Sequence, residues 1–418
     1  MLRRVIGKRD LSGDGRLLTD MVGIGLLTKV FHRDLIDTVL AETKRGEQRK
    51  RLLPARVVVY LVLALTLYAS EAYEEVMRRL VHGLTGLKGW RSDWTVPTDS
   101  AISQARTRLG WEPLAALFDR AAVPVARPGA QSAFFAGKRV VAIDGVVLDV
   151  PDTPANAAEF GYSGKTDTNR SAFPQVRIVT MSEVGTHATI GAALDGIGTG
   201  ERTLATEVMA TYLTEQMLLV ADRGFYSYDM WKKAMLTGAD LLWRVSDTLD
   251  LPIRQWLPDG SYLSDLLPPK VKSAITRTGR PELGDGLRVP VRVIEYMVEG
   301  RGEDTTMIRL ITTLTDYERA FATPLAAVYA ERWEHELVFD EIETHQMHSS
   351  KVLRSRTPDL VKQEIWAYLL THYAIRAFMA EAAEDLGDDP DRYSFTRSIR
   401  MVRRTVDDQA GFSPLHPR

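Results

Sequence analysis

Two short apolar segments, each followed by an aspartate, most narrowly limit how this chain can fold. Residues 140–143 precede Asp144, and residues 217–221 precede Asp222. Neither segment shows the alternation of apolar and polar residues that a strand with one wet face requires. Continuously apolar runs of this length are typical of central strands covered on both faces. The chain is therefore predicted to belong to the α/β class, with a mixed sheet flanked by helices.

The two aspartates are predicted to lie close together. Residues 138–150 are expected to form two strands around a turn, with Asp144 at the end of the first, and Asp222 directly follows the other strand. Open α/β sheets build their sites where strands end. A single strand-end Asp is most often a cap or turn residue, but two of them favour a functional site.

Carboxylates that converge in this way indicate a metal site with oxygen ligands. The chain contains no cysteine, which excludes disulfides, thiolate ligands and a cysteine nucleophile. Oxygen donors suit Mg²⁺ or Mn²⁺. Two such ions held by three acids are the usual apparatus for attack on a phosphodiester.

A third acid is expected from the segment between Tyr329 and Glu343, which contains no Gly or Pro and is predicted to form one helix. At about 100° per residue, Tyr329, Arg332, Glu336, Asp340 and Glu343 share one stripe. Carboxylates three and four residues apart repel one another unless a cation lies among them. The alternative is a solvated acidic helix face.

The N-terminal region, residues 1–135, is predicted to be helical. A capped helix at residues 98–110 carries Ser103, Gln104, Arg106 and Arg108, whose side chains can reach phosphates or base edges. This segment has the outline of helix-turn-helix recognition, or it is a plain polar surface helix. Other helices are predicted at residues 23–40, 54–69 and 73–80.

Charge and hydropathy exclude some classes of protein. The net charge of −2 argues against a uniformly basic nucleic-acid binder, although residues 1–56 hold 13 Lys plus Arg and 7 Asp plus Glu, a balance of +6. The basic run at residues 44–51 can grip phosphates or form a solvated loop. The N-terminus lacks a signal-peptide core, and the apolar run 57–69 is too short to span a bilayer. A cytoplasmic protein is expected.

The chain resembles a known family at several motifs: AIDG around Asp144, ADRGF around Asp222, and YAERWEHE from Tyr329 to Glu336. These motifs, together with EQRKRLLPARVVVYLVLALTLY and SAISQARTRLG near the N-terminus, are similar to the DDE transposases of bacterial insertion sequences in the group named after insertion element four. That group carries a Tyr-(2)-Arg-(3)-Glu-(6)-Lys signature, whose spacing the chain reproduces. The resemblance extends over nearly the whole sequence.

The resemblance implies a fold and a set of roles. It implies an RNase H-like core, with Asp144, Asp222 and Glu336 as catalytic and metal-binding residues for two Mg²⁺ (or Mn²⁺) ions that serve strand cleavage and strand transfer at transposon ends. It implies DNA as the partner, met by Tyr329, Arg332 and Arg223 near the scissile phosphate, and a homodimer in a paired-end complex.

The residue patterns along the chain, together with the resemblance, predict five parts. These are a helical DNA-end-binding domain at 1–135, a first part of the catalytic core at 136–248, a β-rich insertion at 249–306 that interrupts the sheet, a second part of the core with the acidic helix at 307–380, and a C-terminal helical tail at 381–418.

One residue departs from the signature, because Glu343 occupies the position of the closing Lys. A carboxylate repels phosphate where an ammonium would attract it. Two alternatives to a working transposase therefore stay open. One is a catalytically weakened or inactive DNA-binding remnant, and the other is a metal-dependent nuclease without strand transfer.

Overall fold

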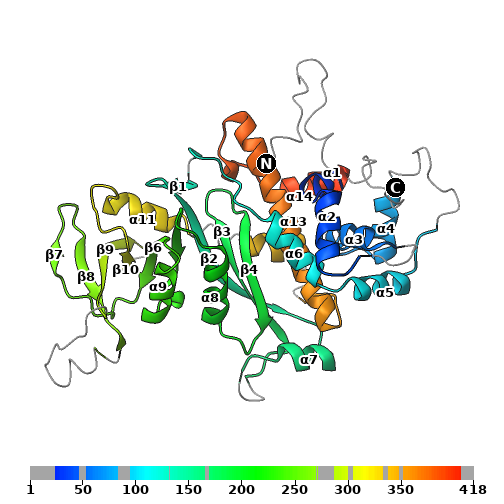
Figure 1. Cartoon of the computed structure of the whole chain (residues 1–418), viewed down its shortest axis with the longest axis horizontal. Helices are drawn as coiled ribbons and strands as arrows, with labels where there is room; N and C mark the ends of the chain where they lie inside the picture. The colour runs from blue at the N-terminus through cyan, green and yellow to red at the C-terminus, as the bar shows by residue number, and fades with distance from the viewer. Residues whose placement is uncertain are drawn as a thin grey trace.

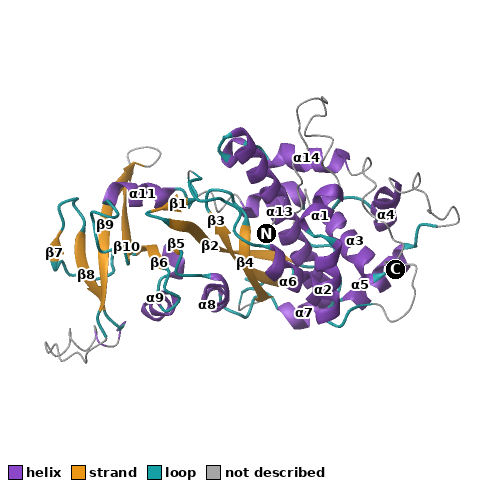
Figure 2. Cartoon of the chain, turned by 45° about the horizontal axis from the view of Figure 1, so that its top comes forward, coloured by secondary structure: helices purple, strands orange, loops and turns teal. Residues whose placement is uncertain are grey.

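A computed structural model describes residues 24–46, 53–82, 95–130, 132–164, 169–269, 271, 287–299, 305–332, 338–347 and 352–405. The strands lie at one end of an elongated molecule and most helices at the other (Figure 1). Figure 2 shows the same division by secondary structure, with α8 and α9 beside the sheet and the remaining helices largely gathered at the opposite end.

The described part of residues 24–121 is largely helical. Its helices are α1 (Ile24–Val30), α2 (Arg33–Glu42), α3 (Ala55–Leu67), α4 (Tyr73–His82), α5 (Asp99–Leu109) and α6 (Glu112–Ala121). The single helix expected at residues 23–40 is two helices, because the chain turns at Phe31 and His32, and His32 caps α2 by accepting a hydrogen bond from the Asp34 amide.

The capped helix predicted at residues 98–110 is confirmed as α5. The Thr98 hydroxyl accepts a hydrogen bond from the Ala101 amide at 3.3 Å, which satisfies one of the free amides of the first turn. Gly110 ends the helix with a φ of +71°, a conformation that L side chains rarely adopt.

The central sheet has the strand order β4-β3-β2-β5-β6-β10-β9-β8-β7. Its strands are β2 (Lys138–Asp149), β3 (Gln175–Glu183), β4 (Thr189–Gly196), β5 (Met217–Ala221), β6 (Asp240–Val245), β7 (Gln255–Trp256), β8 (Tyr262–Leu266), β9 (Val289–Glu299) and β10 (Thr305–Thr312), while the short β1 (Phe134–Phe135) pairs with β2. β5 runs parallel to β2 and to β6, and β3 runs antiparallel to β2. The mixed sheet expected from the sequence is thus confirmed.

The strands of the predicted insertion extend this sheet. β9 pairs with β10, β8 with β9 and β7 with β8, and β10 pairs in turn with β6 of the first half. The residues predicted to form a β-rich insertion after the first part of the core thus contain strands, and their backbone hydrogen bonds continue the edge of the sheet. In Figure 1 they form the end of the molecule farthest from the N-terminal helices.

Helices cover both faces of the sheet. On one face, α8 (Glu201–Tyr212) and α9 (Tyr228–Met235) pack over Val141, Ile143 and Leu219. On the other face, α11 (Ala322–Ala330) covers Val140 and Ala142.

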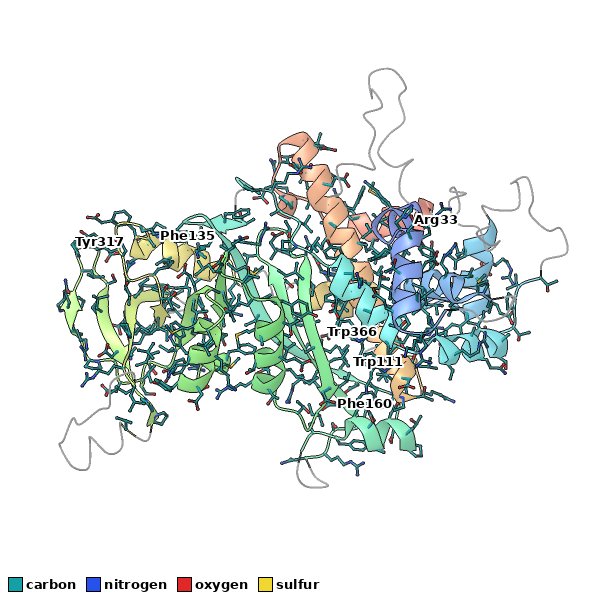
Figure 3. The ribbon with its side chains drawn as sticks, viewed as in Figure 1. Arg33, Trp111, Phe135, Phe160, Tyr317 and Trp366 are labelled. Atoms are coloured by element: carbon teal, nitrogen blue, oxygen red, sulfur yellow. The ribbon has the colours of Figure 1, made fainter. Side chains whose placement is uncertain are left out.

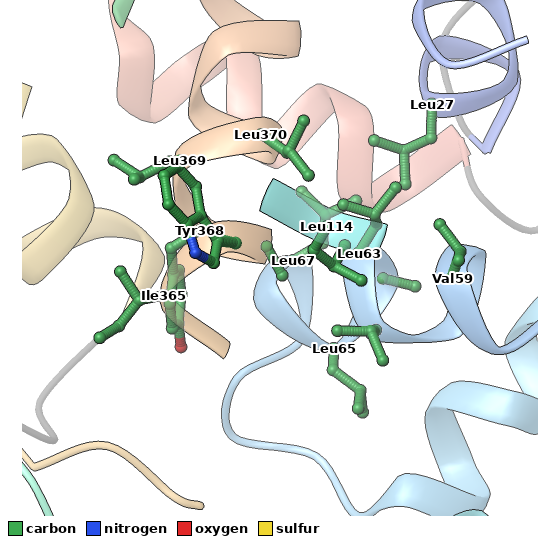
Figure 4. Packing of buried hydrophobic residues seen from close by; sticks show 14 of the residues in the cluster. Leu27, Val59, Leu63, Leu65, Leu67, Leu114, Ile365, Tyr368, Leu369 and Leu370 are labelled. Carbon is green, nitrogen blue, oxygen red and sulfur yellow. The ribbon is translucent and has the colours of Figure 1, made fainter. Parts of the chain in front are cut away.

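The helical layer covers the remaining part of that second face. It consists of α1 to α6 together with α13 (Pro358–Leu386) and α14 (Phe395–Thr405), and α7 (Pro154–Phe160) lies at its edge. Figure 4 shows how closely it is packed: Leu63 and Leu67 of α3 and Leu114 of α6 lie beside Leu369 and Leu370 of α13.

One apolar cluster joins the helical layer to the sheet. It contains Leu148 and Ile178 of the strands as well as residues of α1, α3 and α13. Figure 3 places Trp111, Phe160 and Trp366 at this junction. The predicted boundary at residue 380 falls inside α13, which runs through the layer as one helix of 29 residues. No helix within the described ranges is long and apolar enough to cross a membrane.

Candidate active site

Strand register brings Asp144 and Asp222 side by side. β2 and β5 are parallel, and their last paired residues are Ile143 and Ala221, so the two aspartates follow at the next position on neighbouring strands. Adjacent strands lie about 4.8 Å apart. Side chains alternate between faces, and Ala142 belongs to the cluster beneath α11, so Asp144 points to that same face.

The prediction that Asp144 ends its strand is wrong, whereas Asp222 does follow the end of β5. β2 is one strand of 12 residues, and Asp144 pairs with Thr180 of β3 in its middle. Residues beyond Asp144 keep a hydrogen-bonding partner because β3 is longer than β5. β5, the parallel neighbour of β2, ends at Ala221 while β2 continues past Asp144. Both carboxylates therefore lie at the end of β5, where the sheet becomes narrower.

Tyr329 on α11 holds Asp222 in place. Its hydroxyl donates a hydrogen bond to Asp222 Oδ1 at 3.1 Å. Burial raises the pKa of Tyr329 to about 12, so the hydroxyl keeps its proton and acts as a donor. The Asp222 side chain remains 39% exposed, which leaves it open to a ligand.

Arg332 adds a buried positive charge to the same site. It is 4% exposed and lies with its Cζ atom 5.8 Å from the centre of the Tyr329 ring. Burial by itself would lower the pKa of Arg332, but Tyr329, Asp222 and Asp144 together raise it. Tyr329, Arg332 and the two aspartates, widely separated in the sequence, therefore share one electrostatic environment.

A further cation in the site was not predicted. Arg244 lies on β6 with its Nη1 atom 4.0 Å from Asp222 Oδ1. Its neighbours Trp243 and Val245 face the α8 and α9 side, so alternation along β6 directs Arg244 toward Asp222. The apolar-Arg-apolar pattern at residues 243–245 was the available signal, since a charge flanked by buried residues on a central strand needs a partner.

The single helix predicted from Tyr329 to Glu343 is not observed. α11 ends at Ala330, and a turn follows at Glu331 and Arg332. Residues 333–337, which include Glu336, lie outside the described residues. The structure therefore does not locate the third predicted acid. The chain is helical again at 338–340 and continues as the π-helix η4 (Glu341–Gln346).

The change of helix type alters the predicted stripe. A π-helix turns less per residue than an α-helix, so positions three and four apart no longer coincide. Asp340 is exposed and Glu343 is half-buried, while the buried acid of this segment is Glu341.

The two described carboxylates fit a hard divalent cation. They are oxygen donors on neighbouring strands, and the partly exposed Asp222 carboxylate is free to coordinate a cation from the solvent side. Among the described residues no group of three or more His, Asp or Glu could hold a metal ion.

Most of the residues predicted to contact DNA, three on α5 and one after β5, have side chains that are at least partly exposed. Gln104 and Arg108 are exposed and Ser103 is half-buried, and Arg223, in the 3-10 helix η3 (Arg223–Phe225) after Asp222, is also exposed.

The prediction is wrong for Arg106, which is 3% exposed. Its guanidinium donates to Gln363 Oε1 at 2.9 Å, to the Tyr73 hydroxyl at 2.7 Å and to Ser355 Oγ at 3.2 Å. These bonds lead into the protein, and they use all three guanidinium nitrogens.

Residues 83–94, which connect α4 to the segment before α5, lie outside the described residues, so the helix-turn-helix outline stays a prediction.

Comparison with known proteins gives consistent matches along the chain. The family model described as insertion element 4 transposase N-terminal matches residues 21–119, and the transposase DDE domain matches residues 135–373. The transposase InsG for insertion sequence element IS4 of Escherichia coli (strain K12) is 30% identical over 390 residues, which cover 91% of this chain and 82% of InsG.

Two further matches are weaker. The putative transposase InsZ of Escherichia coli (strain K12) is 27% identical over 195 residues, 47% of this chain and 62% of InsZ. A chain from a cryo-EM structure of the piggyBac transposase synaptic complex with hairpin DNA aligns with a TM-score of 0.48 and 12% identity, covering 96% of this chain and 84% of that one.

Proposed function

The chain belongs to the insertion element 4 family of DDE transposases, and from this premise we propose that it binds the terminal inverted repeats of an insertion sequence and carries out Mg²⁺-dependent strand cleavage and strand transfer. Its mixed sheet flanked by helices has the RNase H-like fold, and the protein is an enzyme that acts on DNA. The observation that supports the finer proposal best is the adjacency of Asp144 and Asp222, with the hydroxyl of Tyr329 bonded to the latter.

The proposed roles rest on the charge and place of the described residues and, for Glu336, on the family signature. Asp144 and Asp222, with Glu336, are the acids that would hold two Mg²⁺ or Mn²⁺ ions, and bound ions would polarise the scissile phosphate and activate the attacking oxygen. Tyr329 orients Asp222, and the buried Arg332 supplies positive charge beside these acids, which would stabilise a phosphate bound at the site.

DNA ends are expected to contact the exposed side chains of the helical layer and of the site rim. The candidates are the exposed Gln104, Arg108 and Arg223, together with the half-buried Ser103. We further propose that the protein works in the cytoplasm as a homodimer that holds two ends together, with the helices of residues 1–135 as its end-binding part.

A product assay tests this function. Purified protein is mixed with labelled DNA that carries the inverted repeats flanking its own gene, with Mg²⁺ or with EDTA. We expect cuts at the repeat boundary followed by joined products, with Mg²⁺ only. Cuts without joined products would indicate a nuclease, and binding without cuts would indicate a remnant.

Replacement of Glu343 by Lys is expected to raise strand transfer about tenfold, because a hydrogen bond to a charged group contributes about 1.5 kcal/mol or more. The substitution removes a like charge from the acidic segment and restores the ammonium of the family signature. Joined product per unit time is the measurement.

Asp340→Lys is the matched control for this substitution. It makes the same charge change three residues away, at an exposed position outside the signature. Equal gains in both variants would mean that general charge, and not the signature position, limits activity. No gain in Glu343→Lys would refute the prediction.

A further inference from the structure

Arg292 is a fully buried cation in the β-rich end of the sheet. It lies on β9, where it pairs with Thr312 of β10 and Leu263 of β8, and its side chain is 0% exposed. Ile294, two residues further along β9, belongs to the cluster beneath α11, so alternation directs Arg292 to the same face. A buried guanidinium is stable only when its donors are bonded and its charge is balanced.

The donors of Arg292 join the turn after β7 to the segment that leads into α11. Its Nε donates to Ser261 Oγ at 2.7 Å, and its Nη2 donates to Asp259 Oδ2. Its Nη1 donates to the backbone oxygen of Leu314 at 3.3 Å and to that of Ala320. All three nitrogens are therefore bonded, and both ends of the loop before α11 are fixed to one side chain.

Asp259 balances this charge and also holds the first amide of α11. Its Oδ2 accepts a hydrogen bond from the Ala322 amide at 2.8 Å, and its Oδ1 accepts one from the Ser261 amide at 3.2 Å. The N-cap residue Phe321 offers no side-chain acceptor, so the capping carboxylate comes from the turn between β7 and β8, 63 residues earlier than Ala322. A carboxylate at this position satisfies a free amide and interacts favourably with the helix dipole.

The surroundings of Asp259 keep its carboxyl ionised. Burial by itself would raise the pKa of Asp259, but the hydrogen bonds from Ser261 and Ala322 and the charge of Arg292 lower it. The side chains of Asp259 and Arg292 are 7% and 0% exposed, so water screens this pair little. Loss of the Asp259 charge would leave a buried cation unbalanced beside the first turn of α11.

α11 links Asp259 to the candidate active site. Tyr329, seven residues after Ala322, donates its hydroxyl to Asp222 Oδ1. At about 1.5 Å per residue, the Cα atoms of Ala322 and Tyr329 lie about 10 Å apart along the helix. Leu325, between them, is fully buried against the sheet. A helix of nine residues is marginal by itself in water, so α11 depends on its packing and on the bonds at its two ends.

We propose that Asp259 is a positioning residue, which sets the place of the Tyr329 hydroxyl on Asp222 by holding the first turn of α11. The β-rich end of the sheet thereby supports the site from a distance. This inference rests on the proposed function, because it takes Asp222 as a metal-binding acid. A positioning role predicts that Asp259 and Tyr329 act in series on cleavage, whereas a purely structural role predicts independent effects.

The test compares Asp259→Asn with Asp265→Asn. Asp265, on β8, is buried to a similar degree, with a side chain 8% exposed, and it pairs with Arg254 and Arg288. Within the described ranges its carboxylate is bonded to no residue of α11. Both substitutions keep the volume of the side chain and remove a buried negative charge, so the contact with α11 is what distinguishes them.

The first measurement is hydrogen exchange in the protein without metal or DNA. In Asp259→Asn we expect exchange in residues 322–332 to rise about tenfold while β2 and β5 stay protected. Asp265→Asn should leave residues 322–332 as in the wild type. Ser261→Ala is a milder variant, because it removes the hydroxyl that bonds Asp259 and Arg292 but keeps their ion pair. It should raise the same exchange about threefold.

The second measurement is a double-mutant cycle on single-turnover cleavage with Mg²⁺. We expect Asp259→Asn and Tyr329→Phe each to slow cleavage about tenfold, the contribution of about one hydrogen bond to a charged group. The double variant should be at most about twofold slower than Tyr329→Phe, because Asp259 acts through that hydroxyl. Asp265→Asn should cleave within about twofold of the wild-type rate.

Two results would overturn the proposal. One is an additive cycle, in which the double variant is about a hundredfold slower than the wild type. The other is exchange that rises over the whole chain in Asp259→Asn and stays unchanged at residues 322–332 in Ser261→Ala, which would make Asp259 a stability residue only. If the wild type cuts no DNA with Mg²⁺, the proposed function fails and the positioning role fails with it. Exchange that rises at residues 322–332 alone would then show only that Asp259 holds α11.

Discussion

Replacement of Asp222 by Asn is expected to reduce strand cleavage about a thousandfold, which corresponds to about 4 kcal/mol of lost transition-state stabilisation. The amide keeps the volume of the side chain and can still accept the hydrogen bond from Tyr329. It cannot supply the negative charge that a divalent cation needs. Single-turnover cleavage of an end-labelled substrate measures the effect.

The control for this substitution is Asp152→Asn. Asp152 is exposed and accepts a hydrogen bond from the Tyr162 hydroxyl at 2.6 Å, on the loop after β2. This variant should cleave at the wild-type rate. Affinity for DNA ends in EDTA should stay within about twofold in both variants, because phosphate contacts supply most of that affinity. Cleavage by Asp222→Asn within tenfold of wild type would contradict the assignment of Asp222.

Replacement of Arg106 by Met is expected to lower the free energy of unfolding by about 3–5 kcal/mol. Three hydrogen bonds from a charged group are lost, each worth about 1.5 kcal/mol or more. Gln363, Tyr73 and Ser355 would keep buried polar atoms without their present partner. Urea unfolding followed by circular dichroism gives the value.

Arg108→Met provides a contrast on the same helix. Arg108 is exposed, so its loss should change the unfolding free energy by only about 0.5 kcal/mol. It should instead weaken binding to DNA ends and reduce the dependence of that binding on salt. If Arg106→Met had normal stability but weak DNA binding, Arg106 would act in DNA binding and not in stabilising the fold.

Local patterns were sufficient for much of the fold. The Thr98 cap, the terminal Gly110 and the apolar run before Asp222 are local signals. The helix α5 and the strand β5 lie at the positions that these signals predict. The Arg106 error was avoidable, because Ile102, Ala105 and Leu109 define an apolar face on which residue 106 also falls.

Other features depend on partners far away in the sequence. The position of Asp144 within its strand follows from the length of β3, which no pattern around Asp144 reveals. The cluster around Glu341 needs His187, His372 and Arg376, all more than thirty residues away from it. The π-helix η4 likewise has distant partners, since Glu341 in its first turn is bonded to His372 and Arg376 of α13.

α13 has a mechanical consequence for the enzyme. Gln363 near its start is bonded to Arg106 of α5, and Arg376 in its second half is bonded to Glu341. At about 1.5 Å per residue, these two attachments are about 20 Å apart on one rigid rod. A displacement of α5 would therefore be transmitted along α13 to the segment that begins at Glu341.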